Sequence, residues 1–217
     1  MKIAIIYLAS VMLFFGCANG QTGNRNAMAP VPKSAVGEAV ATFGGGCFWS
    51  MSEAMIELKG VSKVVSGYAG GKTKNPTYEE VSDRTTGHAE VTQIYYNPKE
   101  ISFATLAEAF FFAHDPTTLN RQGPDVGTDY RSIAFYRTPE EKETLISVIK
   151  KVNDTKHYTN PIVTQVVPFS AFYAAENYHQ GYYRTNGDNP YISSVSEPKV
   201  MKFRKAMKAE LKQEFLK

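Results

Sequence analysis

Three consecutive glycines, Gly44 to Gly46, separate a segment with strand-like alternation from a segment with helical spacing. The alternation over 38–43 predicts a strand, and the good helix formers over 48–58 predict a helix. Glycine is used where the backbone turns sharply or approaches another group closely. The run therefore predicts a tight strand-to-helix turn, with Cys47 at the start of the helix.

Cys47 is one of two cysteines, and Trp49 is the only tryptophan. Backbone N–H groups at the start of a helix have no intrahelical partner, and the helix dipole favours negative charge there. Such a setting lowers a thiol pKa, which predicts a reactive thiolate. Phe48 and Trp49 add an apolar wall, so the segment indicates a nucleophilic sulfur beside an apolar pocket. The alternative is a buried structural cysteine with a core tryptophan, which is the usual role of a lone cysteine.

The rest of the pattern alternates strands and helices. We expect further strands over 61–68, 88–96, 132–136 and 162–167, helices over 103–114 and 139–152, and one helical turn over 78–81. The order predicts an α+β fold: a two-layer sandwich with a split β-α-β (ferredoxin-like) core, an additional strand and a helical C-terminal tail.

The N-terminus predicts export. Lys2 precedes an apolar run over 3–15 that is too short to span a bilayer and typical of a signal peptide, expected over 1–16. Gly16-Cys17 resembles the bacterial lipoprotein cleavage box, which implies lipidation at Cys17; an ordinary cleaved signal peptide is the alternative. Residues 17–36 are rich in Asn, Gly, Pro and Ala and are expected to form a flexible tether.

A single folded domain is expected over 37–198, followed by a basic amphipathic helix over 199–217. In that tail an apolar stripe lies opposite lysines, and we expect a solvated basic face, with contact to anionic lipid as the alternative. The net charge of +3 does not indicate nucleic acid binding. Two cysteines and four scattered histidines form no metal-site pattern.

Four clusters near predicted loops carry more chemistry than loops need: Gly46-Cys47-Phe48-Trp49, Asn75-Pro76-Thr77-Tyr78-Glu79-Glu80-Val81, Thr86-Gly87-His88-Ala89-Glu90-Val91 and Asp125-Val126-Gly127-Thr128-Asp129-Tyr130-Arg131-Ser132. In this order and spacing they resemble the peptide methionine sulfoxide reductase A family, which reduces the S epimer of methionine sulfoxide. The resemblance covers residues 40–181.

Sulfoxide reduction needs a sulfur nucleophile, an acid for the oxygen and an apolar slot for the methyl group. Cys47 supplies the nucleophile. Glu90 is the best acid, because an apolar pocket raises a carboxyl pKa and keeps the proton on it. A solvated edge carboxylate is the usual role of an isolated strand glutamate. The resemblance assigns the proton-donor role to Glu90.

The resemblance implies further substrate contacts. Tyr78 and Tyr130 would bind the sulfoxide oxygen, Phe48 and Trp49 would enclose the methyl group, and Asp125 would arrange the site. Core packing for the aromatic residues and a turn role for Asp125 are the alternatives. His88 either orients Glu90 or fills the turn, and the aromatic segment over 172–183 is expected to pack across the core.

No cysteine follows Cys47, whereas many family members carry further cysteines that resolve the oxidised nucleophile. The resemblance therefore implies a sulfenic acid recycled by an external thiol: a thioredoxin-like protein, glutaredoxin or glutathione. It implies no metal or organic cofactor. We expect a monomer held to the bacterial cell envelope by its lipid.

Two rival functions stay open from the residues: a one-cysteine thiol peroxidase and a non-catalytic binder of oxidised peptides. The peroxidase usually needs a cationic group beside the thiolate, and the sequence neighbours of Cys47 supply none.

Overall fold

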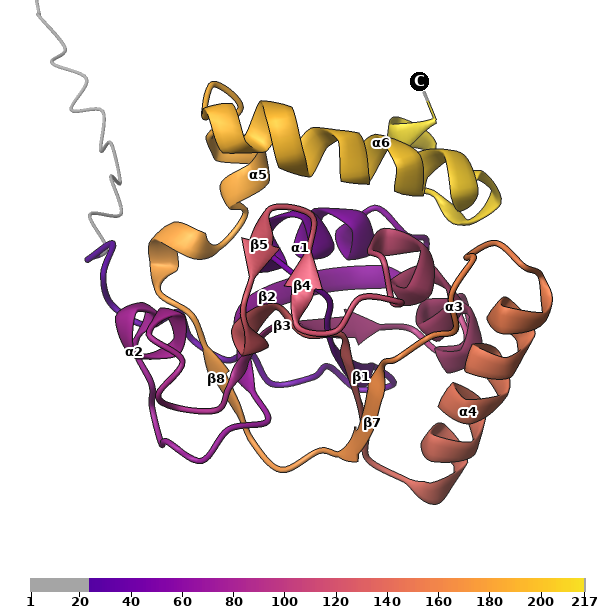
Figure 1. The fold of residues 1–217 in the computed structure, drawn as a ribbon, viewed down its shortest axis with the longest axis horizontal. Coiled ribbons are helices and arrows are strands. Elements are labelled where there is room, and N and C mark those ends of the chain that lie inside the picture. Colours follow the sequence, from indigo (N-terminus) through magenta and orange to yellow (C-terminus); the bar gives the residue numbers. More distant parts are fainter. Residues whose placement is uncertain (1–23, 217) are drawn as a thin grey trace, which may run out of the picture.

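A six-stranded mixed sheet organises residues 24–216, the part of the chain that this computed structural model describes (Figure 1). The strand order is β7-β6-β1-β3-β2-β8, and all neighbours are antiparallel except the parallel pair β6 and β7. The strands are β1 (Ala39–Gly44), β2 (Val61–Ala69), β3 (Ala89–Tyr96), β6 (Ile133–Tyr136), β7 (Gln165–Pro168) and β8 (Phe172–Ala174).

The described residues also form six α-helices: α1 (Phe48–Ile56), α2 (Tyr78–Ser82), α3 (Phe103–Ala113), α4 (Pro139–Asp154), α5 (Tyr182–Thr185) and α6 (Glu197–Ala206). Strands β1, β2, β3 and β6 with helices α1 and α3 form a split β-α-β unit, since β3 lies between β1 and β2. The predicted α+β fold is confirmed. No helix in residues 24–216 combines the length and apolarity needed to cross a membrane.

The main core lies between the sheet and helices α1, α3, α4 and α6. Phe43 of β1 stacks on Phe110 of α3 with ring centroids 4.8 Å apart, and both side chains are fully buried. Residues of α6 belong to the same core, because Phe203 is fully buried in it. The core therefore fixes α1, whose N-terminus carries Cys47, from several sides.

Local sequence signals explain where the helices start. Ser102 caps α3 by accepting a hydrogen bond from the Thr105 N–H at 3.0 Å. Thr77 and Glu80 form a reciprocal capping box at α2. These caps satisfy N–H groups that would otherwise lack partners. Because capping residues can be recognised in the sequence, the helix starts agree closely with the predicted ones.

The structure differs from the predictions in the C-terminal tail. The tail helix α6 ends at Ala206, and two 3-10 turns follow at Lys208–Glu210 and Gln213–Phe215. A continuous helix over 199–217 is therefore wrong. The apolar stripe still packs inward, and Leu211 forms an isolated bridge with Leu58.

Part of the expected tether is bound to the domain. The Ala29 N–H donates to the Ala175 carbonyl at 3.0 Å, and the Tyr178 N–H donates to the Arg25 carbonyl at 3.1 Å. The Tyr95 hydroxyl donates to the Pro32 carbonyl at 2.7 Å. Residues 25–32 thus lie along the domain, and the flexible segment expected over 17–36 does not extend through them. The expected signal peptide and Cys17 lie outside the described residues.

Candidate active site

The glycine turn before Cys47 is packed from three directions. A Cβ on Gly44 would lie 2.6 Å from the Glu90 carbonyl, and one on Gly45 would lie 2.6 Å from the His114 ring. Gly46 has a φ of +81°, and its Cβ would lie 2.6 Å from Gln122. Only glycine permits both this backbone conformation and this approach. The turn thereby holds Cys47 as the N-cap residue of α1.

Glu90 lies beside the start of α1. Its Oε2 accepts a hydrogen bond from the Phe48 N–H at 3.0 Å, one of the N–H groups left unpaired by the helix. Cys47 is 6% exposed and Glu90 is 3% exposed, so both reactive candidates are almost completely buried. The structure therefore brings the predicted nucleophile and the predicted acid to one end of α1.

Burial sets the protonation of both groups. Desolvation, reinforced by the charges of Asp129 and Asp125, raises the pKa of Glu90 to about 8, although the Phe48 N–H acts in the opposite direction. Glu90 therefore holds its proton at neutral pH, as predicted. Burial, and secondly the negative charge of Glu90, raises the pKa of the Cys47 thiol well above its ordinary value. The expected lowering at the helix N-terminus is wrong for this closed site, because desolvation exceeds the effect of the helix.

Aromatic residues surround Cys47 in a group that we call the aromatic cluster. Its buried members are Cys47, Phe48, Tyr68, Val81 and Ala175, and its partly buried members are Trp49, Tyr78, Tyr130 and Tyr191. Burial, and secondly the charge of Glu90, raises the pKa of both Tyr78 and Tyr130. These two phenols therefore stay neutral hydrogen-bond donors. They come from α2 and from the 3-10 turn Thr128–Tyr130, 52 residues apart by their numbers.

Asp125 joins the site through a residue that the sequence did not indicate. It begins strand β5 (Asp125–Val126), which pairs with β4 (Arg121–Gln122) in a small hairpin. The Tyr191 hydroxyl donates to its Oδ2 at 2.5 Å. Tyr191 also lies close enough to the Cys47 thiol to act on its pKa through a hydrogen bond. Asp125 therefore positions a tyrosine beside the sulfur.

Trp49 is held by a polar network on its other side. The indole Nε1–H donates to His179 Nδ1 at 3.1 Å, and the Tyr182 ring stacks on the indole with centroids 3.9 Å apart. His179 Nε2 faces Glu176 Oε2 at 3.8 Å. Glu176 also accepts hydrogen bonds from the Tyr78 N–H at 2.9 Å and from the Tyr68 hydroxyl at 3.0 Å. His179 and Glu176, close but not hydrogen-bonded, thus place the supports of Trp49 and of the Tyr78 backbone side by side.

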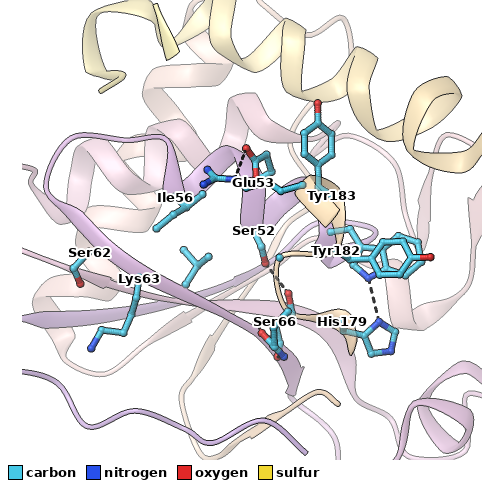
Figure 2. A pocket seen from close by; sticks show the side chains of 14 residues that line it. Ser52, Glu53, Ile56, Ser62, Lys63, Ser66, His179, Tyr182 and Tyr183 are labelled. Atoms are coloured by element: carbon cyan, nitrogen blue, oxygen red, sulfur yellow. Dashed lines mark hydrogen bonds and ion pairs between the residues drawn. The ribbon is translucent and has the colours of Figure 1, made fainter. Parts of the chain in front are cut away.

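A cavity of about 250 Å³ lies beside this network, between α1, β2 and residues 179–184 (Figure 2). Trp49 and His179 line it, whereas Cys47 and Glu90 do not. In Figure 2 a dashed line that ends at His179 marks the hydrogen bond from the Trp49 indole. Trp49 therefore belongs both to the lining of this cavity and to the aromatic cluster.

The family model for peptide methionine sulfoxide reductase matches residues 39–212. The chain belongs to this family. The match includes α6 as well as all six strands.

Methionine sulfoxide reductases from distant organisms match most of the chain. A peptide methionine sulfoxide reductase MsrA from Haloquadratum walsbyi is 50% identical over 171 residues, covering 79% of this chain and 97% of the relative. One from Leptospira borgpetersenii is 50% identical over 165 residues, covering 76% and 93%. The reduced form of Mxr1 from Saccharomyces cerevisiae superposes with a TM-score of 0.68 at 33% identity, covering 72% of this chain and 91% of that one.

The other predicted residues of this methionine sulfoxide reductase take clear positions. Cys47, Phe48, Trp49, Tyr78, Glu90, Asp125 and Tyr130 all lie in or directly against the aromatic cluster. His88 does not orient Glu90. Its Nδ1 accepts from the Gly71 N–H at 3.0 Å, and its Nε2 lies 2.8 Å from the Thr73 carbonyl, so it holds the loop after β2.

Sequence reasoning missed His179, Glu176 and Tyr191 as parts of the reductase site. His179 and Glu176 lie in the aromatic segment that was expected to pack across the core, and the polar pair within it was the available signal. Tyr191 follows an irregular stretch without periodicity, so no local signal marked it.

Proposed function

We propose that this protein reduces methionine S-sulfoxide, free or within proteins, with Cys47 as the nucleophile and Glu90 as the acid. Membership of the methionine sulfoxide reductase family supports the reaction. The single observation that carries the roles is the Glu90 carboxyl, buried beside Cys47 at the start of α1, where desolvation raises its pKa.

The reaction transfers one oxygen atom. Tyr78 and Tyr130 donate hydrogen bonds to the sulfoxide oxygen, and Phe48 and Trp49 enclose the methyl group. Glu90 gives its proton to the oxygen, which makes the sulfoxide sulfur electrophilic. The Cys47 thiol attacks this sulfur and gives its proton back to Glu90. The sulfur–oxygen bond of the substrate then breaks, the oxygen passes to Cys47 as a sulfenic acid, and methionine leaves as the thioether. Asp125 keeps Tyr191 beside the Cys47 sulfur throughout.

An external thiol completes the cycle, and no prosthetic group takes part. The sequence contains two cysteines, Cys17 and Cys47, and Cys47 is a free cysteine. We propose that the sulfenic acid persists until a thioredoxin-like protein, glutaredoxin or a small thiol such as glutathione attacks it.

One experiment tests the reaction and both rivals. The enzyme, prepared from residue 24 onward, should reduce a methyl sulfoxide with the S configuration and show far lower turnover with hydrogen peroxide. Cys47→Ser should abolish sulfoxide reduction, because a hydroxyl is a poor nucleophile at neutral pH. After one turnover without reductant, the intact mass should rise by one oxygen. Sulfoxide turnover in Cys47→Ser would refute the mechanism, and peroxide turnover alone would favour the peroxidase.

We further propose that Cys17 is lipidated and anchors the enzyme to the bacterial cell envelope. The apolar run over 3–15 and the Gly16-Cys17 pair support this proposal. Radiolabelled palmitate should label the full chain in cells, and Cys17→Ala should abolish the label. An unlabelled, soluble mature protein would point instead to an ordinary cleaved signal peptide.

A further inference from the structure

A second cavity, of about 240 Å³, lies against the turn that holds Cys47. Lys199 and Lys202 of α6 line one side, and Gln122 of β4 lines the other. Gln122 is the residue against which Gly46 packs. At ~30 Å³ per water molecule, the space equals about eight waters. It can therefore hold the polar end of a small molecule beside the turn.

Positive charge predominates around this cavity. Within residues 24–216 Lys202 forms no ion pair, and Lys199 Nζ lies 3.7 Å from Asp125 Oδ2. The Arg121 guanidinium also lies nearby, since its Nε–H donates to the carbonyl of the lining residue Gly123 at 2.9 Å. Together these three cations favour an anionic ligand.

The neighbouring titratable groups oppose this charge only in part. Asp115 lines the cavity, and its Oδ1 already accepts hydrogen bonds from the Thr117 N–H at 2.9 Å and the Thr117 hydroxyl at 2.6 Å. His114 also lines it, and burial lowers the pKa of this histidine to about 4, so its ring is neutral at pH 7. Two lysines and one carboxylate therefore line the cavity.

The cavity is linked to the reactive sulfur through a chain of side chains that starts at its lining residue Lys199. Lys199 approaches the same Asp125 oxygen that accepts the Tyr191 hydroxyl, and Tyr191 lies beside the Cys47 thiol. A ligand held by the lysines thus lies on the Asp125 side of the sulfur. Cys47 is recessed, at 6% exposed, so a slender molecule can approach it more easily than a folded domain.

We propose that this cavity binds the carboxylate end of a small anionic thiol, and that this thiol recycles Cys47. The inference rests on the proposed function and names its reductant. The thiolate attacks the sulfenic acid sulfur, a mixed disulfide forms, and the hydroxyl leaves as water after taking one proton. A second thiol then attacks the mixed disulfide, so that Cys47 returns as a thiol and the two small thiols leave as their disulfide.

The test compares thiols of different charge at saturating methyl sulfoxide. Glutathione serves as the anionic monothiol, and 2-mercaptoethanol and the diethyl ester of glutathione serve as thiols without free carboxylates. Lys202→Glu replaces an attraction by a repulsion and should raise the apparent KM for glutathione about two- to fivefold. The same variant should leave turnover with 2-mercaptoethanol unchanged. The matched control is Lys205→Glu, on the same helix, exposed and outside the cavity.

The comparison of the thiols and the two lysine variants shows whether the cavity binds an anionic thiol. The proposal is supported if glutathione saturates at lower concentration than its ester, and if Lys202→Glu alone removes this advantage. It is overturned if both lysine variants affect glutathione equally, if the ester matches glutathione, or if only a thioredoxin-like protein supports turnover. If the wild-type enzyme reduced methyl sulfoxide with none of these thiols, the proposed function itself would be refuted.

Discussion

At the residue scale, the site keeps both of its reactive groups protonated at rest. Burial favours the neutral form of Cys47 and of Glu90, and a charge on Glu90 would further disfavour ionisation of the Cys47 thiol. When a sulfoxide binds, its oxygen accepts a hydrogen bond from Glu90 and can then receive the Glu90 proton. Motif spacing predicted both residues, whereas the pKa of Cys47 depended on burial that no local pattern reveals.

The first prediction concerns Glu90. Because the acid works in its protonated form and its pKa is about 8, the reduction rate should be constant below that pH and fall as pH rises through 8. Glu90→Gln should lower the single-turnover rate by ~10²–10⁴-fold and abolish this inflection. Glu143→Gln, an exposed glutamate on α4, is the control and should change neither. A wild-type rate in Glu90→Gln would exclude the acid role.

The second prediction concerns Trp49, the only tryptophan and therefore the only indole fluorophore. Sulfoxide or dimethyl sulfoxide binding should change its emission, because the indole borders the aromatic cluster. Trp49→Ala should raise KM by about tenfold or more, since one buried aromatic contact is lost from the pocket. Stopped-flow fluorescence and steady-state kinetics measure both. Silent fluorescence with normal kinetics would make Trp49 a packing residue only.

At the element scale, the sequence predicted the long periodic segments and also the short elements α2, β6 and β7, but not the shortest strands. Strands β1 to β3 and helices α1, α3 and α4 span six to sixteen residues, enough for a period to emerge. Strands β4 and β5 have two residues each, and β8 has three. Such short pairings are set by tertiary contacts. The missed part of the site, from Glu176 to Tyr191, lies among these short elements.

The third prediction tests the network between β8 and α5. His179→Phe removes the acceptor of the Trp49 indole N–H, a bond worth ~0.5–1.5 kcal/mol, and should raise KM about two- to tenfold. His179→Gln keeps an oxygen acceptor and should restore much of this loss. Because Glu90 is untouched, the inflection near pH 8 should persist in both variants. Equal KM values for the Phe variant and wild type would show that the network does not position Trp49.

At the whole-molecule scale, the tail is part of the core. Phe203 of α6 and Leu211 after it are almost completely buried against the same cluster as α1 and α3. Sequence patterning identified the apolar stripe correctly, but it could not show which surface the stripe covers. The catalytic domain therefore continues structurally past residue 198, and α6 supplies two lysines beside the site.

The fourth prediction follows from this packing. Phe203→Ala should lower the free energy of unfolding by about 3–5 kcal/mol, because it leaves a cavity in a dense core. Met201→Ala, on the same helix and 52% exposed, should change it by about 0.5 kcal/mol or less. Urea unfolding followed by circular dichroism measures both. A small change for Phe203→Ala would mean that the tail packs weakly on the domain.

The contacts of residues 25–29 with residues 175–178 decide where the chain departs toward its N-terminus. That exit lies beside α2, which carries Tyr78, rather than behind the sheet (Figure 1). Asn24 follows Cys17 by seven residues. Because an extended chain covers at most ~3.6 Å per residue, these two residues can lie at most about 25 Å apart. If Cys17 carries a lipid, the α2 side of the domain is held close to the bilayer, and oxidised methionines near the membrane are the ones within its reach.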